Sequence, residues 1–478
     1  MEEDVRPALP AVTAPIRRGD AMRRRVSIVL LCVFIPIAMH AACDYVASRR
    51  LFATVDDLRQ RGEPVSRNAL GRWQPPASAE ETQAARLYSA AAALAYHDWT
   101  VAHEAPGGIK QQPLSRVRDD LESVAKERAL APETAASLQA LVDTFGDAFA
   151  MMDRAAGLVF SRFIPHDFED YPRTYSLEEL AEASAARTIM LASGGNGDDA
   201  ARSLWSTLKL RRAHVRTAPW LSEELVALQF LLEHARPSLQ LLQQVQDGYA
   251  ERQAPDATAR GLRELRAVGI DALFAEWYGR QTDPLTPAAY ARWAWRPSLP
   301  LRPWVARQAT HALKISQHAV NAAQLPWPAR IEALRQLAAL QPDPGSRRGR
   351  PGIHDYGRYI IRGVGEEGVI RDAMRLTQIR SALAAVAVER FRRDRSGVFP
   401  NTLEETVPTY MPAVPEDPFT GRPLRYLVDA TRFVVYSPGP DGTDDRGLVG
   451  PLPLHVWKVT TADIGLEIRT FSPEEERK

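Results

Sequence analysis

The chain has 478 residues, and its 60 Lys and Arg against 59 Asp and Glu leave it close to neutral. Because its basic residues do not gather in a long run, the composition argues against a dedicated nucleic-acid-binding protein. Hydrophobic residues make up 45% of the chain, which excludes general disorder. Cys32 and Cys43 are its two cysteines, and both lie in an apolar N-terminal stretch. The rest of the chain therefore has neither a disulfide nor a cysteine-based metal site.

The apolar stretch near the N-terminus is typical of a membrane helix. Residues 26–39 carry no charge, and counting through Cys43 gives about 18 residues, near the lower limit for a spanning helix. We therefore expect a transmembrane anchor at residues 26–47, in contact with the lipid bilayer.

Charged residues are distributed unequally on the two sides of this stretch. Two arginines, Arg49 and Arg50, follow it closely, whereas five lie close before it: Arg17, Arg18, Arg23, Arg24 and Arg25. By the positive-inside rule, this difference keeps residues 1–25 in the cytoplasm and exports the rest of the chain. The expected location is the bacterial inner membrane, with a single pass and the bulk of the chain periplasmic or otherwise extracytoplasmic.

Two other outcomes stay open for the N-terminal stretch. The small residues before Cys43 could form the cleavage site of a signal peptide. Cys43 could instead carry a lipid, although a lipoprotein signal has an aliphatic residue where this chain has His40. Besides these two, the stretch could be a buried core helix, an interpretation that the arginines directly before it weaken.

The middle of the chain is predicted to be helical. Residues 48–77 are polar and contain several prolines, which predicts a linker. Residues 78–395 then follow helical periodicity, with few convincing strands, and no clean repeat recurs. We expect a large exported helical domain, built as an irregular bundle or solenoid. Long surfaces on such folds commonly bind other proteins.

Three successive helices of this domain have clear start and stop signals. A capping box at Ser176 and Glu179 predicts the start of the first, which should end at Gly194 and Gly195. The second should begin with Asp198 and Asp199, whose charges suit a helix N-terminus. The third should follow Ser222, with Glu223 and Glu224 in its first turn and an end near Pro237.

Two groups of residues resemble ligand sites without completing them. Gly363, Gly365 and Gly368 have the spacing of a dinucleotide-binding loop, but Glu366 and Glu367 would place negative charge beside the phosphates. A hinge before the next long helix is the preferred interpretation.

Histidines also fall short of a complete metal site. His311 and His318 lie two turns apart on one expected helix face, with no third ligand evident nearby. The acidic stretch 166–172 is interpreted as a solvated loop. Because no metalloprotease, nucleophile-elbow or phosphate-loop motif is present, we assign no catalytic and no cofactor-binding residues. Catalysis by carboxylates distant in the sequence stays open.

The C-terminal part, residues 396–478, is expected to be a small α+β module. A long helix over about residues 369–394 should precede it, and Thr402 with Glu405 should cap a short helix. Residues 423–428 and 432–437 predict an antiparallel hairpin, and a third strand is expected at 451–457.

The order of parts over about residues 375–447 resembles the C-terminal half of the major pseudopilin of type II secretion systems. The shared pattern combines a long helix, G-x-x-P-x-T-L-x-E, D-P-x-x-G-x-P-x-x-Y and Y-S-x-G-x-D-G. In that family the acidic loop after the last strand binds calcium. The resemblance therefore implies a calcium site at Asp441, with Asp444 and Asp445 as the nearest further carboxylates, the ligand type that this cation prefers. A solvated acidic turn is the alternative.

These observations together favour a mainly α-helical, membrane-anchored protein of the bacterial envelope. Its expected role is binding or scaffolding through an envelope protein partner, near a secretion or pilus-type machine. The main alternative is an envelope hydrolase that uses carboxylates or a metal in the helical domain, and a purely structural spacer is the third.

Overall fold

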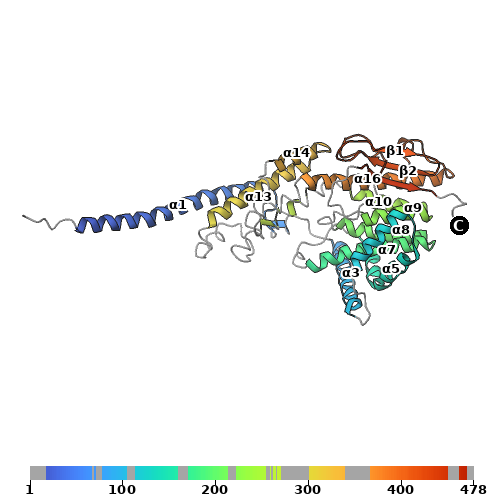
Figure 1. The fold of residues 1–478 in the computed structure, drawn as a ribbon, viewed down its shortest axis with the longest axis horizontal. Coiled ribbons are helices and arrows are strands. Elements are labelled where there is room, and N and C mark those ends of the chain that lie inside the picture. The colour runs from blue at the N-terminus through green and yellow to red at the C-terminus, as the bar shows by residue number, and fades with distance from the viewer. Residues whose placement is uncertain are drawn as a thin grey trace, which may run out of the picture.

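The computed structural model describes residues 18–66, 69–70, 78–104, 113–159, 171–213, 222–253, 301–339, 366–449 and 462–470, with parts of 259–270. This part of the chain is mainly α-helical and contains one small antiparallel sheet. Helix α1 projects from one end of an elongated molecule, and the sheet lies near the other end (Figure 1).

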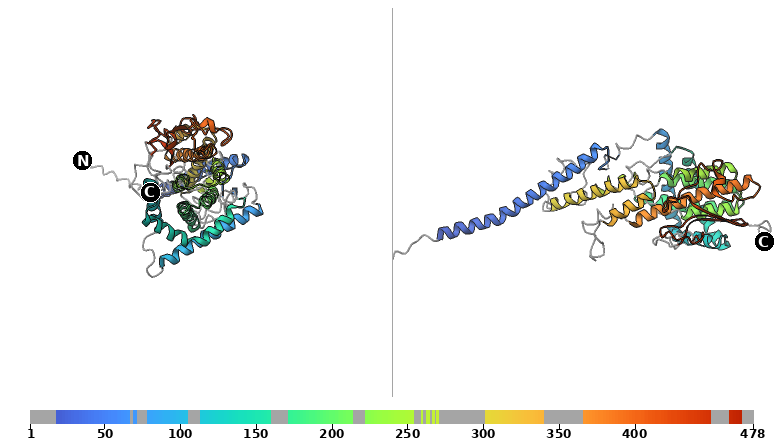
Figure 2. Two further views of the ribbon diagram at one scale, coloured as in Figure 1. Left: turned by 90° about the vertical axis from the view of Figure 1, so that its right-hand side faces the viewer. Right: turned by 90° about the horizontal axis from the view of Figure 1, so that it is seen from above.

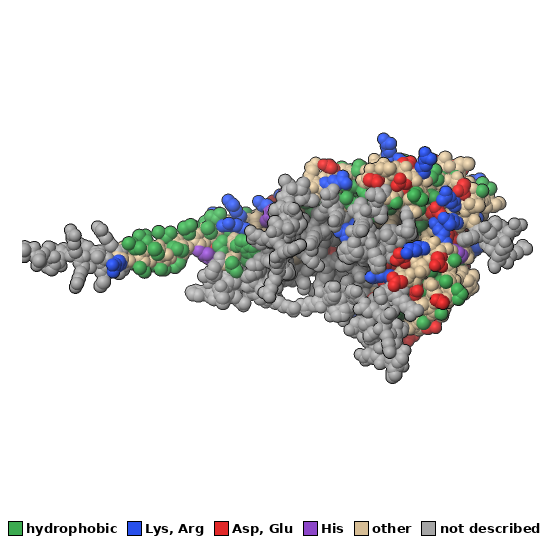
Figure 3. All heavy atoms as spheres, in the orientation of Figure 1, with side chains coloured by type: hydrophobic (Ala, Val, Ile, Leu, Met, Phe, Trp, Pro, Cys, Tyr) green, Lys and Arg blue, Asp and Glu red, His purple; other side chains and the backbone are tan. Residues whose placement is uncertain are grey.

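Helix α1 (Arg18–Gln60) is uninterrupted over 43 residues, which corresponds to a length of about 65 Å at 1.5 Å per residue. Residues 27–39 of this helix are uncharged and exposed on every side, and hydrophobic side chains cover much of the visible face of the projecting helix (Figure 3). Among the described residues, the segment Ser27–Gln60 is the one long and apolar enough to cross a membrane. Such exposure fits a membrane anchor or a signal sequence.

The second half of α1 is helical where a linker was expected from residue 48. Ala47, Leu51 and Val55 recur every four residues on one face of the helix and are buried against α13 (Arg302–Ala323). The two helices run in the same direction: Arg302 at the start of α13 pairs with Asp44 at 3.3 Å, and later residues of α13 (313–321) line a groove with later residues of α1 (50–61). This packing explains why the helix continues to Gln60. We call α1 from residue 44 onward, together with α13, the stalk (Figure 2).

The remaining helices form a bundle beyond the stalk. Helix α7 packs against α8 and α9, and α10 packs against α8 and α16. The bounds of these helices are α3 (Ala79–Glu104), α4 (Pro113–Glu127), α5 (Pro132–Thr144), α6 (Gly146–Ala156), α7 (Tyr171–Ser193), α8 (Gly197–Ala213), α9 (Ser222–His234), α10 (Leu239–Glu251), α14 (Ala329–Ala339) and α16 (Glu366–Asp394).

Most of the helix boundaries expected over residues 176–237 are confirmed. Helix α7 ends before Gly194, and Gly195 adopts a φ of +78°, a conformation that glycine takes without steric cost. Helices α8 and α9 begin where the acidic residues indicated. The helix start expected at Ser176 is wrong, since α7 begins at Tyr171. Pro172 suits the first turn of a helix, so the chain enters the helix earlier.

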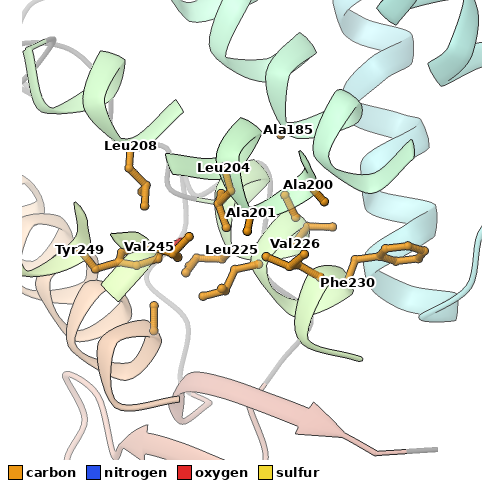
Figure 4. Packing of buried hydrophobic residues seen from close by; sticks show 14 of the residues in the cluster. Ala185, Ala200, Ala201, Leu204, Leu208, Leu225, Val226, Phe230, Val245 and Tyr249 are labelled. Atoms are coloured by element: carbon orange, nitrogen blue, oxygen red, sulfur yellow. The ribbon is translucent and has the colours of Figure 1, made fainter. Parts of the chain in front are cut away.

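A single hydrophobic core joins the bundle to the sheet. Leu204, Leu225 and Val245 on three helices meet in its centre (Figure 4). The same cluster includes Phe433 and Ile468 of the sheet. Helix α16 contacts both the bundle helix α10 and the strands β2 and β3, so the C-terminal module is packed into the bundle.

The C-terminal module contains a three-stranded antiparallel sheet in the order β1-β2-β3. Its strands are β1 (Arg425–Val428), β2 (Arg432–Ser437) and β3 (Ile464–Arg469). The expected hairpin is thus confirmed, with Tyr426 opposite Val435. The stretch 451–457 expected to be a strand lies outside the described residues.

The short helix expected at the start of this module is present as a 3-10 helix, Leu403–Thr406. The capping box expected for it is not formed, since the Thr402 side chain makes no capping hydrogen bond. Glu405 instead accepts a hydrogen bond from the backbone N–H of Asn401, at 3.2 Å.

Candidate functional site

Several residues singled out in the sequence do not come together in the structure. His311 and His318 are exposed on α13, and the described part of the chain contains no group of three or more His, Cys, Asp or Glu side chains arranged to hold a metal ion. Gly363 and Gly365 lie outside the described residues, as does most of the acidic stretch 166–172. The dinucleotide-like spacing therefore stays untested, and within the described residues neither histidine belongs to a metal site.

The acidic loop after β2 is held by hydrogen bonds to its own carboxylates. Asp441 accepts a hydrogen bond from the Thr443 N–H at 3.0 Å. Asp444 accepts one from the Tyr436 hydroxyl at 3.1 Å and forms an ion pair with Arg425. One of the three expected calcium ligands is therefore neutralised by an arginine.

Sequence reasoning missed Asp463, the residue that ties this loop to the sheet. Its carboxylate is buried and accepts hydrogen bonds from the N–H groups of Asp445 at 3.2 Å and Gly447 at 2.8 Å. Burial raises the pKa of Asp463, as do the charges of Asp444 and Asp445, against these two hydrogen bonds. Calcium binding by Asp441, Asp444 and Asp445 remains a prediction, because these carboxylates are arranged here to hold the loop.

A cluster of buried carboxylates and arginines lies inside the helical bundle. We call it the buried charge cluster; its residues are Arg118, Glu182, Arg211, Glu223, Glu224 and Arg252. Arg211 of α8 lies between two acids of α9, with its Nε 2.9 Å from Glu224 and its Nη2 3.8 Å from Glu223. Arg252 also pairs with Glu224. Arg118 donates to Glu182 of α7 through its Nε at 3.0 Å.

The environment of these acids shifts their protonation. Burial, followed by the charge of Glu223, raises the pKa of Glu182 to about 7, against the opposing effect of Arg118. Burial also raises the pKa of Glu223, and Arg211 opposes that shift. Carboxylates with different environments are what acid–base catalysis requires, but structural ion-pair networks shift pKa values as well.

The position of α9 explains why its acids are buried. Residues Glu223 to Leu232 are all buried, so α9 is enclosed on every face by the bundle and the sheet. The sequence carries a signal for this, since Leu225, Val226, Leu228 and Phe230 leave the helix without a polar face. Acids on such a helix must be paired with internal cations.

Two grooves are open to solvent elsewhere. One, of about 520 Å³, lies between α1 and α13 and is lined by Arg50, Lys314 and His318 among others. The other, of about 350 Å³, lies between α14 and the C-terminal module, where Glu332 and Arg335 face the loop containing Asp441. Residues of the buried charge cluster line neither groove.

Strand β1 forms one edge of the sheet and exposes apolar side chains. Leu427 and Val428 are exposed at its end, and Leu448 in the following loop is 71% exposed. Gly447 brings that loop against β1, since a Cβ placed on it would lie 3.0 Å from a methyl group of Leu427. We call Leu427, Val428 and Leu448 the apolar edge. An edge strand with exposed apolar side chains is a surface to which another chain can bind.

In comparisons with known protein families, with curated proteins and with solved structures, no match to this chain was found.

Proposed function

We propose that this protein is a membrane-anchored binding or scaffolding protein of the bacterial envelope. Its apolar edge is the observation that carries this proposal: Leu427 and Val428 are exposed on the edge strand β1, and Leu448 is exposed in the loop that packs against it. Soluble surfaces rarely leave such residues adjacent without a partner. The partner is an envelope protein that adds to β1 or packs over it.

The proposed topology places α1 in the inner membrane with its N-terminus in the cytoplasm. The exposed apolar side chains of α1 support the anchor, and the arginines before it support the orientation. The sheet then lies at the end of the molecule away from the membrane (Figure 1). In this arrangement the anchor and the apolar edge lie at opposite ends of the molecule, one in the membrane and the other available to a partner.

A place near a secretion or pilus-type machine is part of the same proposal. Its support is the sequence resemblance of residues 375–447 to a pseudopilin, together with the long helix α16 packed against an antiparallel hairpin. A binding partner from such a machine would be the direct test.

The experiment is in-cell crosslinking and native-membrane co-purification of the full chain beside the L427K/L448K variant. We expect the unchanged chain to retain an envelope partner and the variant to lose it, because two charges on the apolar edge oppose burial. The V159K variant is the matched control, since Val159 is also exposed but lies in the helical bundle. If all three proteins recover the same partner in equal amounts, the apolar edge does not bind that partner and the proposal loses its main support.

An envelope hydrolase is the second candidate, and the buried charge cluster is the observation that favours it. Glu182 and Glu223 offer carboxylates with raised pKa values. The test is hydrolysis of chromogenic ester, phosphoester and glycoside substrates by the full chain and by the E223Q variant. Activity that is lost in E223Q while the fold is retained would replace the scaffold proposal.

A further inference from the structure

We propose that the groove between α1 and α13 binds a phosphate-bearing anion, the headgroup of an anionic phospholipid beside the membrane anchor. This inference rests on the proposed role of α1 as an anchor. It adds a second lipid contact, made by the folded part of the chain.

The groove carries an excess of positive charge. Arg50 on α1 and Lys314 on α13 both line it, and their side chains are exposed. Neither cation has an ion-pair partner among the residues that the structure describes. The acid in the groove, Asp57, is engaged by Arg61 at 2.9 Å, so these two charges cancel. Two cations on facing helices thus remain for a ligand.

The chemistry of these two cations suits a phosphate group. An arginine presents a planar fork that can donate two hydrogen bonds to phosphate oxygens, and a lysine adds a mobile point charge. His318 lies four residues after Lys314 on α13 and lines the same groove. A cavity of about 520 Å³ is large enough for a headgroup.

The position of the groove points to a lipid as the source of that phosphate. Arg50 follows Cys43, the end of the apolar stretch, by seven residues on one continuous helix, or about 10 Å along its axis. The headgroup layers extend roughly 5–7 Å beyond the hydrocarbon core, and a long arginine side chain can reach back toward them.

Tyr45 and Arg49 also indicate that this part of α1 lies at the membrane surface. Tyr45 is exposed, and its hydroxyl accepts a hydrogen bond from Arg49 at 3.3 Å. Exposed tyrosines and arginines at the end of a spanning helix are typical of the membrane–water interface. The membrane-proximal end of the groove, at Arg50, therefore opens close to the headgroups.

The test uses the full chain in a neutral detergent, with short-chain phosphatidylglycerol, short-chain phosphatidylcholine and inorganic phosphate as separate probes. Binding is measured by the rise in the thermal midpoint and by titration. We expect phosphatidylglycerol to bind more tightly than the other two. The R50A/K314A variant should weaken that binding at least tenfold, because both unpaired cations are removed.

The matched control is the K126A/R154A variant, which removes the same charge from the surface of the bundle and should bind as the unchanged chain does. Equal binding of both lipids, or undiminished binding by R50A/K314A, would overturn the inference. If inorganic phosphate binds more tightly than phosphatidylglycerol, the groove binds free phosphate and not a lipid headgroup. If the full chain is recovered outside the membrane fraction in cells, the proposed function itself fails; a membrane-bound chain that does not distinguish the lipids refutes this inference alone.

Discussion

Arg128, just after α4, forms an ion pair with Glu467 of β3, with 3.0 Å between its Nη2 and the carboxylate. Its Nη1 lies 2.7 Å from Glu233 of α9. One arginine thus links an early helix, the central helix and the last strand. Gln229 of α9 also donates to the backbone carbonyl of Glu467, at 3.1 Å. The sheet and the bundle are therefore joined by polar contacts as well as by their shared core.

We predict that R128A lowers the free energy of unfolding by about 3–5 kcal/mol, because it leaves the buried side chain of Glu233 without its ion-pair partner. Glu467 keeps its ion pairs with Arg432 and Arg469. Chemical denaturation of the detergent-solubilised chain measures the effect. The control is R202A, whose pair with Asp199 is exposed and should contribute at most about 1 kcal/mol. Similar small losses in both variants would contradict the role given to Arg128.

The joint core leads to a prediction about Phe433, which is fully buried on β2 and lies edge-on to Phe399. We expect F433A to destabilise the protein by about 3–5 kcal/mol. Because the core is shared, amide hydrogen exchange should accelerate in α9 as well as in the sheet. Exchange that accelerates in the strands alone would show that residues 396–478 unfold as a separate domain. For the same reason, deleting these residues would expose the bundle core and would not test partner binding cleanly.

Local signals predicted the helices, the glycine turn and the hairpin, because each is specified by neighbouring residues. The acids at 198 and 199 and the glycine at 195 each act within one turn of chain. The buried charge cluster could not be predicted in this way. Its members come from four helices and from the residue after α10, and their spacing in the sequence carries no periodic pattern. Asp463 was missed for the same reason, since it holds a loop that lies 16 residues earlier.

Glu182 should make stability depend on pH. Between its ordinary pKa of 4.5 and its folded value of about 7, the folded protein holds a proton that the unfolded chain has released. The free energy of unfolding therefore falls as the pH rises through this window, by at most about 3 kcal/mol from this group. The slope should be smaller in E182Q, which is neutral throughout.

The comparison with E182Q isolates this contribution. Burial lowers the pKa of His234, so that residue acts in the opposite direction and destabilises the fold as the pH falls below 6.5. The E182Q variant removes the contribution of Glu182 and keeps that of His234. Denaturation midpoints measured from pH 5 to pH 8 report the difference. The E122Q variant, altered at the surface of α4, should keep the slope of the unchanged chain.

The acidic loop gives a prediction about calcium. Arg425 neutralises Asp444, so it competes with any cation for that carboxylate. We expect R425A to bind calcium more tightly than the unchanged chain, which would show as a larger rise in thermal midpoint on adding calcium chloride. Adding D441N to R425A should remove the effect. If calcium changes neither protein, the loop is a solvated acidic turn.

The state of Cys43 decides between the anchor and its two alternatives. Helix α1 passes through Cys43 without interruption, and the residues that follow it pack against α13. We expect the purified membrane protein to have the intact mass of the whole chain and C43S to stay in the membrane fraction. In contrast, L31R should reduce membrane recovery, because an arginine within the spanning segment costs about 2.5–3.5 kcal/mol. An A53R variant is its control, since Ala53 lies beyond the apolar stretch and is exposed. A mass that begins after residue 42, or a lipid adduct lost in C43S, would replace the anchor with a processed N-terminus.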